Sequence, residues 1–243
     1  MTELLYLHDS YLREFDASLM AVDGTSVVLE RTAFYPGGGG QPPDAGSLRS
    51  PDAGSLRWPG GTARVIEMRR QADQLWHVLD APGPDVGTSV HGALDWDRRY
   101  VIMRYHSALH VLVGVIYKQF GALVTGGAIH PDRARMDFSL EDLNKDRIAT
   151  IEAEANRIIQ ERRRLLVRYV SREEFERSDL SRLAGALLPP QIREVRVLDI
   201  EGFDAQADGG THVATTEEIG RLTITKTENK GKFNRRLEIV LSS

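Results

Sequence analysis

Short β-type segments, separated by turns rich in glycine and proline, fill roughly the first 95 residues of the chain. Residues 26–29 and 63–68 are two such segments, and each carries the apolar, β-branched side chains that strands favour. Many short strands at close spacing are typical of a small barrel or sandwich. We therefore predict a β domain over residues 1–95.

Helix-type patterns dominate from Asp97 to about residue 166. They include an amphipathic stretch whose apolar face is formed by Ile148, Ile151, Ala155 and Ile158. A capping-box pattern at residues 139–142 predicts that this helix begins at those residues. Strand-like segments return at residues 165–170, 194–200, 221–226 and 237–241. We predict a second domain, residues 96–243, so that the whole chain is of the α+β class with a mainly antiparallel second sheet.

One stretch of the first domain is duplicated. Residues 43–50 are followed at once by a near copy at residues 51–58. A single repeat of this length cannot build a solenoid, so we expect it to lengthen one hairpin, and we assign it no function.

Composition narrows the functional classes. A net charge of −4 and a pI near 6.0 argue against DNA binding, but local basic patches could still bind tRNA. The absence of cysteine excludes disulfides, thiolate zinc clusters and a cysteine nucleophile. The N-terminus has no basic signal region, and no segment has the roughly 18 apolar residues of a membrane span, so we expect a cytoplasmic protein without a membrane partner.

Two histidines, His106 and His110, lie four residues apart in a run, residues 104–112, that has no proline or glycine. On a helix, residues at this spacing lie one above the other, so both rings can reach one metal ion. A lone pair can equally be two hydrogen-bonded histidines in a helix interface. The zinc-protease pattern is excluded because Ser107 takes the place of its glutamate.

A second pair, Asp208 and His212, is also spaced by four residues but encloses Gly209 and Gly210. Two glycines favour a tight turn that approaches a ligand closely. Alone, His212 would be an ordinary loop histidine. With the upstream pair it predicts a metal site built from a helix and a distant turn.

These residues resemble the editing domain of alanyl-tRNA synthetases and its free-standing AlaX-type relatives, which threonyl-tRNA synthetase shares in part. Residues 98–110 are similar to the family's "RR…MR.HtatH" helix, and residues 209–213 to the end of its "CGGTHV" turn. The resemblance covers nearly the whole chain, and its further matches, in order, are the "FYP.GGGQP" element at 34–42, "R.DF" at 135–138 and "GKgn.Ri" at 231–236.

The resemblance implies an N-terminal β-barrel followed by an α/β editing domain in which helices flank an antiparallel sheet. It also implies hydrolysis of the ester that joins serine or glycine to the tRNA for alanine, an error that a small amino-acid pocket cannot exclude by binding alone. The family binds zinc through three histidines and a cysteine. Here the implied ligands are His106, His110, His212 and Asp208, which stands where the cysteine belongs.

The aspartate leaves two roles open. It can bind the metal directly, because carboxylates are acceptable zinc ligands, although a hard oxygen donor shifts preference toward other divalent ions. Alternatively, three histidines hold the ion and Asp208 orients water. The glycine run, Gly38–Gly40, and Gln41 are candidates for binding the substrate or its oxyanion, and Thr32 for the serine hydroxyl. The run can also be a simple hairpin turn.

Basic residues in two regions are candidates for tRNA phosphates, because Lys and Arg neutralise phosphates whatever the base sequence. The candidates are Arg98 and Arg99 before the histidine helix, and Lys226, Lys230, Lys232, Arg235 and Arg236 near the C-terminus. Two other functions stay open: a tRNA-binding module that lost catalysis with the cysteine, and a metal hydrolase of another small ester or amide.

Overall fold

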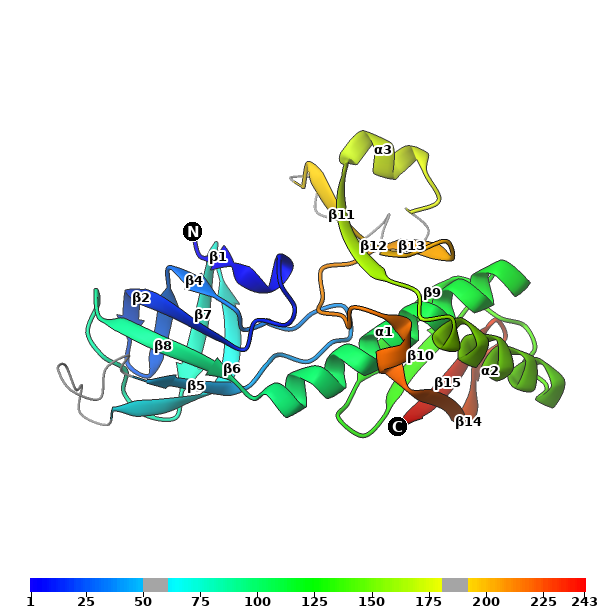
Figure 1. Cartoon of the computed structure of the whole chain (residues 1–243), viewed down its shortest axis with the longest axis horizontal. Helices are drawn as coiled ribbons and strands as arrows, with labels where there is room; N and C mark the ends of the chain where they lie inside the picture. The colour runs from blue at the N-terminus through cyan, green and yellow to red at the C-terminus, as the bar shows by residue number, and fades with distance from the viewer. Residues whose placement is uncertain (50–60, 181–191) are drawn as a thin grey trace. The chain divides into compact units, whose positions relative to one another are not determined.

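The computed structural model describes residues 1–49, 61–180 and 192–243, and the chain forms two compact units. The first unit comprises Met1–Gly38 and Pro42–Val101, and the second comprises Gly39–Gln41 and Ile102–Ser243. The class is α+β, as predicted, with a closed barrel and two antiparallel sheets (Figure 1). The second copy of the duplicated segment lies outside the described residues.

The first unit is built on a six-stranded closed barrel in the order β2-β3-β7-β6-β5-β8. Alternate side chains of its strands, among them Phe15, Val27 and Leu48, point inward and form one apolar core, and Phe34 from the loop after β4 packs in the same core. A short parallel pair, β1 and β4, and the 3-10 helix η1 complete the unit. The strands are β1 (Glu3–Leu4), β2 (Glu14–Asp23), β3 (Ser26–Leu29), β4 (Arg31–Thr32), β5 (Gly46–Arg49), β6 (Thr62–Gln71), β7 (Gln74–Leu79) and β8 (Ser89–Leu94), with η1 at Leu5–Leu7.

One histidine, His77, is fully buried in this barrel. Its Nε2 lies 2.8 Å from Thr32 Oγ1, and its Nδ1 lies 3.4 Å from the Val27 carbonyl oxygen. Burial lowers the pKa of His77 to about 4, because the charged imidazolium loses its hydration. Since an unfolded chain protonates this ring near its usual pKa of 6.5, the barrel loses stability as the pH falls from about 6.5 toward 4.

We therefore expect acidification from about pH 7.5 to 5 to cost His77 about 2 kcal/mol of unfolding free energy. Urea unfolding at the two pH values measures this loss. Other groups titrate as well, so the relevant quantity is the difference between the wild type and His77→Gln, which cannot be protonated. Equal pH dependence in the two proteins would contradict the buried neutral state.

The second unit begins within the helix α1 (Trp96–Phe120), whose residues from Ile102 to Ile116 are largely buried. A four-stranded sheet has the order β14-β15-β10-β9, and a three-stranded sheet has the order β11-β12-β13. The remaining elements are β9 (Val124–Ile129), β10 (Ala134–Phe138), α2 (Lys145–Gln160), β11 (Leu165–Ser171), α3 (Arg172–Arg177), β12 (Glu194–Ile200), β13 (Asp204–Ala207), η2 (Thr216–Ile219), β14 (Arg221–Gly231) and β15 (Asn234–Ser242).

The start of α2 differs from the prediction. The helix begins at Lys145, and its N-cap is Asn144, whose side chain accepts a hydrogen bond from Arg147 N. Ser139 cannot act as the cap because it directly follows β10, and its hydroxyl accepts from Leu123 N. The predicted apolar face is present, with Ile151, Ala155 and Ile158 buried. None of the helices in the described parts of the chain has the length and apolar character of a membrane span.

Candidate metal centre

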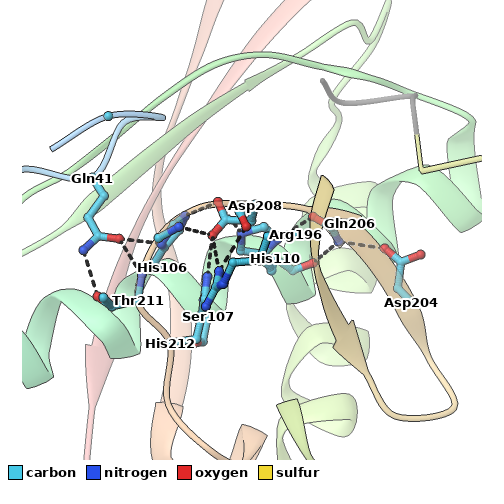
Figure 2. A network of polar contacts seen from close by, with 12 residues as sticks. Gln41, His106, Ser107, His110, Arg196, Asp204, Gln206, Asp208, Thr211 and His212 are labelled. Atoms are coloured by element: carbon cyan, nitrogen blue, oxygen red, sulfur yellow. Dashed lines mark hydrogen bonds and ion pairs between the residues drawn. The ribbon is translucent and has the colours of Figure 1, made fainter. Parts of the chain in front are cut away.

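Two segments of the second unit bring four potential metal ligands together. His106 and His110 lie one turn apart on α1, and Asp208 and His212 flank the glycine turn after β13 (Figure 2). Their ligand atoms all lie within 4.8 Å of one another. The rings of His106 and His212, which come from segments about a hundred residues apart, have centroids separated by only 4.3 Å. The predicted convergence of these four side chains is therefore present.

The glycine turn allows this close approach. At Gly210, an added Cβ would lie 2.4 Å from His106 Cε1 and 2.5 Å from Gln41 Oε1, distances that no side chain tolerates. The Gly210 N–H donates to Asp208 Oδ2 over 2.5 Å. A Cβ added at Gly209 would meet no atom of the described residues within 4 Å. Of the two glycines, Gly210 is thus the one that the packing against His106 requires.

The donor set fits a divalent metal. Asp208 Oδ1 lies 3.5 Å from His106 Nε2 and 3.6 Å from His110 Nε2, and Asp208 Oδ2 lies 2.8 Å from His212 Nε2. Atoms bound tetrahedrally to one zinc at about 2.0–2.1 Å stand roughly 3.3 Å apart, so the two separations from Oδ1 need little adjustment. The shorter contact of His212 Nε2 is a hydrogen bond to the other oxygen, Oδ2. Three imidazoles and one carboxylate are an accepted zinc donor set, and they also suit harder divalent ions.

Two glutamines orient the histidines. His106 Nδ1 donates to Gln41 Oε1 over 2.8 Å, and His110 Nδ1 donates to Gln206 Oε1 over 2.6 Å. Each amide is fixed in turn, because Gln41 Nε2 donates to Thr211 Oγ1 and Gln206 Nε2 donates to the His110 carbonyl oxygen and to Asp204 Oδ2. With Nδ1 protonated, each ring presents the lone pair of Nε2 to the centre, as a metal ligand must.

Electrostatics favour neutral rings beside a charged carboxylate. Burial lowers the pKa of His212 to about 4 and that of His106 well below its usual value, and Arg196 adds to both shifts. Burial alone would raise the pKa of Asp208, but the surrounding histidines and their hydrogen bonds hold it well below the usual value. Both rings are therefore neutral near pH 7, and a cation at the centre has to displace only the Nε2 proton that His212 donates to Asp208 Oδ2.

Gln41 and Thr32 are placed differently from their predicted contacts with substrate. Gln41 is 2% exposed, and its side-chain oxygen and nitrogen are bonded to His106 and Thr211. Thr32 is fully buried in the barrel unit, where its hydroxyl contacts His77. The four glycines before Gln41 all have positive φ, from 57° to 139°. Gly40 also approaches the backbone of Gly127 too closely for a Cβ.

Arg99 has a structural role in place of the predicted phosphate contact. It is fully buried in the barrel unit, where it forms an ion pair with Asp44 and donates to the carbonyl oxygens of Ser10 and Ala33. In the same unit, Arg98 donates to the Pro43 carbonyl oxygen.

The C-terminal basic residues lie on the β14–β15 hairpin, and several have acidic partners. Lys226 and Lys230 contact Glu228, and Arg236 binds both oxygens of Asp137. Arg235 donates to backbone carbonyl oxygens, and Lys232 Nζ lies 5.1 Å from the centre of the Phe233 ring.

Comparisons with known proteins identify the family of the chain. The model described as "Threonyl and Alanyl tRNA synthetase second additional domain" matches residues 195–238, and that of class II (A) tRNA synthetases matches residues 4–98. The alanyl-tRNA editing protein AlaX-M of Saccharolobus solfataricus is 42% identical over 240 residues, which cover 98% of each chain. The AlaX-M of Methanosarcina barkeri is 43% identical over 248 residues, which cover 99% of each.

An alanine–tRNA ligase shares the same region. The ligase of Thermococcus kodakarensis is 38% identical over 232 residues, which cover 93% of this chain but 24% of the ligase. The end-to-end similarity is thus to the editing proteins, and the four convergent side chains lie where the resemblance placed a metal centre. The chain belongs to the AlaX-M family of alanyl-tRNA editing proteins.

Proposed function

We propose that this protein is a trans-acting deacylase that hydrolyses the ester linking serine or glycine to tRNA(Ala), with a divalent ion held by His106, His110, Asp208 and His212. The observation that carries the proposal is the convergence of these four ligand atoms within 4.8 Å. Action in trans is supported by the AlaX-M relatives, which the chain matches over 98% of their length, against 24% for a ligase.

Asp208 is proposed as a ligand through a single oxygen. Its Oδ1 faces the Nε2 atoms of His106 and His110, while its Oδ2 accepts from the Gly210 N–H and from His212 Nε2. Arg196 donates to the Asp208 carbonyl oxygen over 3.0 Å and lies 3.8 Å from Oδ2, so it helps to fix the carboxylate. Zinc is the first candidate, and the oxygen donor makes manganese or cobalt plausible substitutes.

When bound, such an ion polarises an ester carbonyl and acidifies water, which is the chemistry that ester hydrolysis needs. The protein's own groups hold the centre in shape: Gln41 and Gln206 fix the ring tautomers, and Gly210 leaves room for His106. The N–H groups of Gly39 and Gly40, next to Gln41 in the second unit, are proposed to meet the substrate oxygen. Thr32 is left out of this proposal because its hydroxyl is buried against His77.

Contacts with tRNA phosphates are proposed for Arg98 and for the basic residues of the β14–β15 hairpin. Each phosphate contact adds to the salt dependence of binding, so the affinity should fall steeply with ionic strength. Partial neutralisation by Glu228 and Asp137 weakens the field of the hairpin. Arg99 is excluded because it is buried.

The test is deacylation of Ser-tRNA(Ala), Gly-tRNA(Ala) and correctly charged Ala-tRNA(Ala), together with hydrolysis of serine methyl ester. We expect hydrolysis of one or both mischarged tRNAs, little loss of Ala-tRNA(Ala), and poor cleavage of the methyl ester. Equal efficiency on the tRNA and methyl esters would argue against recognition of tRNA. The variant Asp208→Ala tests the role of the carboxylate. If the variant retains both the bound metal and the wild-type rate, Asp208 is not a ligand.

Removing the Gln206 acceptor should weaken metal binding. In Gln206→Met, His110 keeps its Nε2 but loses the partner of its Nδ1, so the affinity for zinc should fall by about 10- to 100-fold. Competition with a chromophoric chelator measures the affinity. Asp204→Asn is the control, because it keeps a side-chain oxygen for Gln206 Nε2 and should bind nearly as tightly as the wild type. An unchanged affinity in Gln206→Met would contradict the orienting role.

A further inference from the structure

The three-stranded sheet has two faces that its register distinguishes. In β11 and β12, Val167 pairs with Leu198 and Tyr169 pairs with Arg196, and in β12 and β13, Leu198 pairs with Gln206. Directly paired residues of antiparallel strands point to the same face. These five residues therefore share one face, which we call the site face.

The opposite face is covered by α3. There Val170, Val195 and Val197 form a buried cluster with Phe175 of the helix. Arg168, which also belongs to this opposite face, lies 3.6 Å from Glu174 of α3 and 3.4 Å from Asp199. These contacts agree with the division that the register implies, and Figure 1 shows α3 on one side of the sheet.

The site face leads directly to the metal centre. Gln206 on β13 contacts His110, and Arg196 on β12 contacts Asp208, as Figure 2 shows. Asp208 N also donates to the Arg196 carbonyl oxygen over 3.1 Å, so Asp208 continues the row that runs from Tyr169 through Arg196. Neighbouring strands are about 4.8 Å apart, which places the Tyr169 backbone on the order of 10 Å from that of Asp208.

Exposure of the side chains changes along β11, one of the two edge strands of this sheet. Leu165 is 8% exposed, whereas Val167 and Tyr169, which point to the same face, are 43% and 46% exposed. The ring of Tyr169 and the side chain of Val167 are therefore partly exposed to solvent on the site face, which also carries Arg196 and Gln206.

We infer that Tyr169, flanked by Val167, is a stacking platform for the unpaired 3′-terminal base of the aminoacyl-tRNA. The inference rests on the proposed function. The scissile ester is attached to the ribose of the terminal nucleotide. When the ester lies at the metal centre, the base of that nucleotide is therefore separated from the centre only by the width of the ribose. Unpaired bases bind proteins by stacking on exposed aromatic rings. Tyr169 is two strands from Asp208 on the same face, at a distance that a nucleoside can bridge.

The first test compares Tyr169→Ala, Tyr169→Phe and Leu166→Ala. Leu166 is the matched control because it is 37% exposed on the same strand but belongs to the opposite face. Stacking on one base is worth a factor of about 5 to 150 in binding, so Tyr169→Ala should raise KM for mischarged tRNA by that factor and leave kcat nearly unchanged. Tyr169→Phe and Leu166→Ala should behave as wild type, and hydrolysis of serine methyl ester should be unchanged in all variants.

A second readout needs no catalysis. An RNA hairpin with 2-aminopurine at its 3′ end should lose fluorescence on binding to wild type and Tyr169→Phe, but much less with Tyr169→Ala at saturating protein. Inactivity of the wild type on every mischarged tRNA would overturn the proposed function, while this measurement still tests the platform. Equal quenching by Tyr169→Ala would overturn the platform alone. The platform would also be overturned if the wild type is a dimer and Tyr169→Ala converts it to a monomer without altering the quenching. In that case the exposed side chains of β11 bind a second copy of the chain.

Discussion

Replacing His106 with alanine should remove the bound metal and lower the rate of deacylation by about a thousandfold or more. A metal ion supplies several kcal/mol of transition-state stabilisation, and each 1.36 kcal/mol corresponds to a factor of ten. The His106 ring also contacts Gln41 and Gly210, so the alanine variant loses a hydrogen bond to Gln41 and the packing against Gly210. Metal content and the rate on mischarged tRNA measure the two effects together.

His130→Ala is the matched control for this change. His130 is exposed, belongs to the same unit and is not among the four clustered ligands. It should keep the metal and the wild-type rate. Circular dichroism checks that His106→Ala is folded. A folded His106→Ala protein that retains one ion and full activity would show that this ring is not a ligand.

Replacing Arg99 with methionine should destabilise the barrel unit by about 3–5 kcal/mol, because the substitution leaves the buried carboxylate of Asp44 without its cation. Arg99 also donates to the carbonyl oxygens of Ser10 and Ala33, which lose their partner in the variant. Urea-induced unfolding measures the free energy. The salt dependence of tRNA binding should not change, since Arg99 is buried and cannot reach a phosphate.

A double-mutant cycle separates the ion pair from lost packing. Asp44→Asn keeps an oxygen that can accept from Tyr35 N but removes the charge. The double variant Arg99→Met/Asp44→Asn should therefore cost clearly less than the sum of the two single changes. A strictly additive result would show that the pair contributes no coupling. A loss below about 1 kcal/mol in Arg99→Met would contradict its buried role.

Each pair of candidate ligands was predictable from local geometry, and the resemblance to the editing family predicted that the two pairs meet. Four-residue spacing on a helix places His106 above His110, and the glycine pair predicts a turn between Asp208 and His212. Strands of both units were also predicted correctly from their amino-acid composition, and residues 26–29 and 194–200 are two examples. Local periodicity and turn chemistry thus carry most of the architecture.

The supporting contacts were not predictable in this way, because they join segments distant in sequence. Gln206 meets His110 only through the folded position of β13, and Arg196 meets Asp208 only through the β12–β13 register. One signal was present for Gln206. It lies two residues before Asp208 in the run DAQAD, so a strand there would place both side chains on one face.

Two predictions from charge and capping patterns were wrong because tertiary contacts override the local pattern. Arg99 looks like a surface cation beside Arg98, yet helix phase and Asp44 place it in the interior. Ser139 fits a capping box, but the preceding strand extends to Phe138, and Asn144 caps the helix instead. In both positions, a partner elsewhere in the fold decides the role of the side chain.

The most direct test of the metal centre is the deacylation rate measured through a cycle of chelation and metal return. The protein is dialysed against a chelator, freed of it, and titrated with zinc, manganese or cobalt while bound ions and the rate on Ser-tRNA(Ala) and Gly-tRNA(Ala) are followed. We predict that activity disappears with the metal and returns in proportion to one ion per chain. Full activity in protein shown to contain no ion would contradict the account.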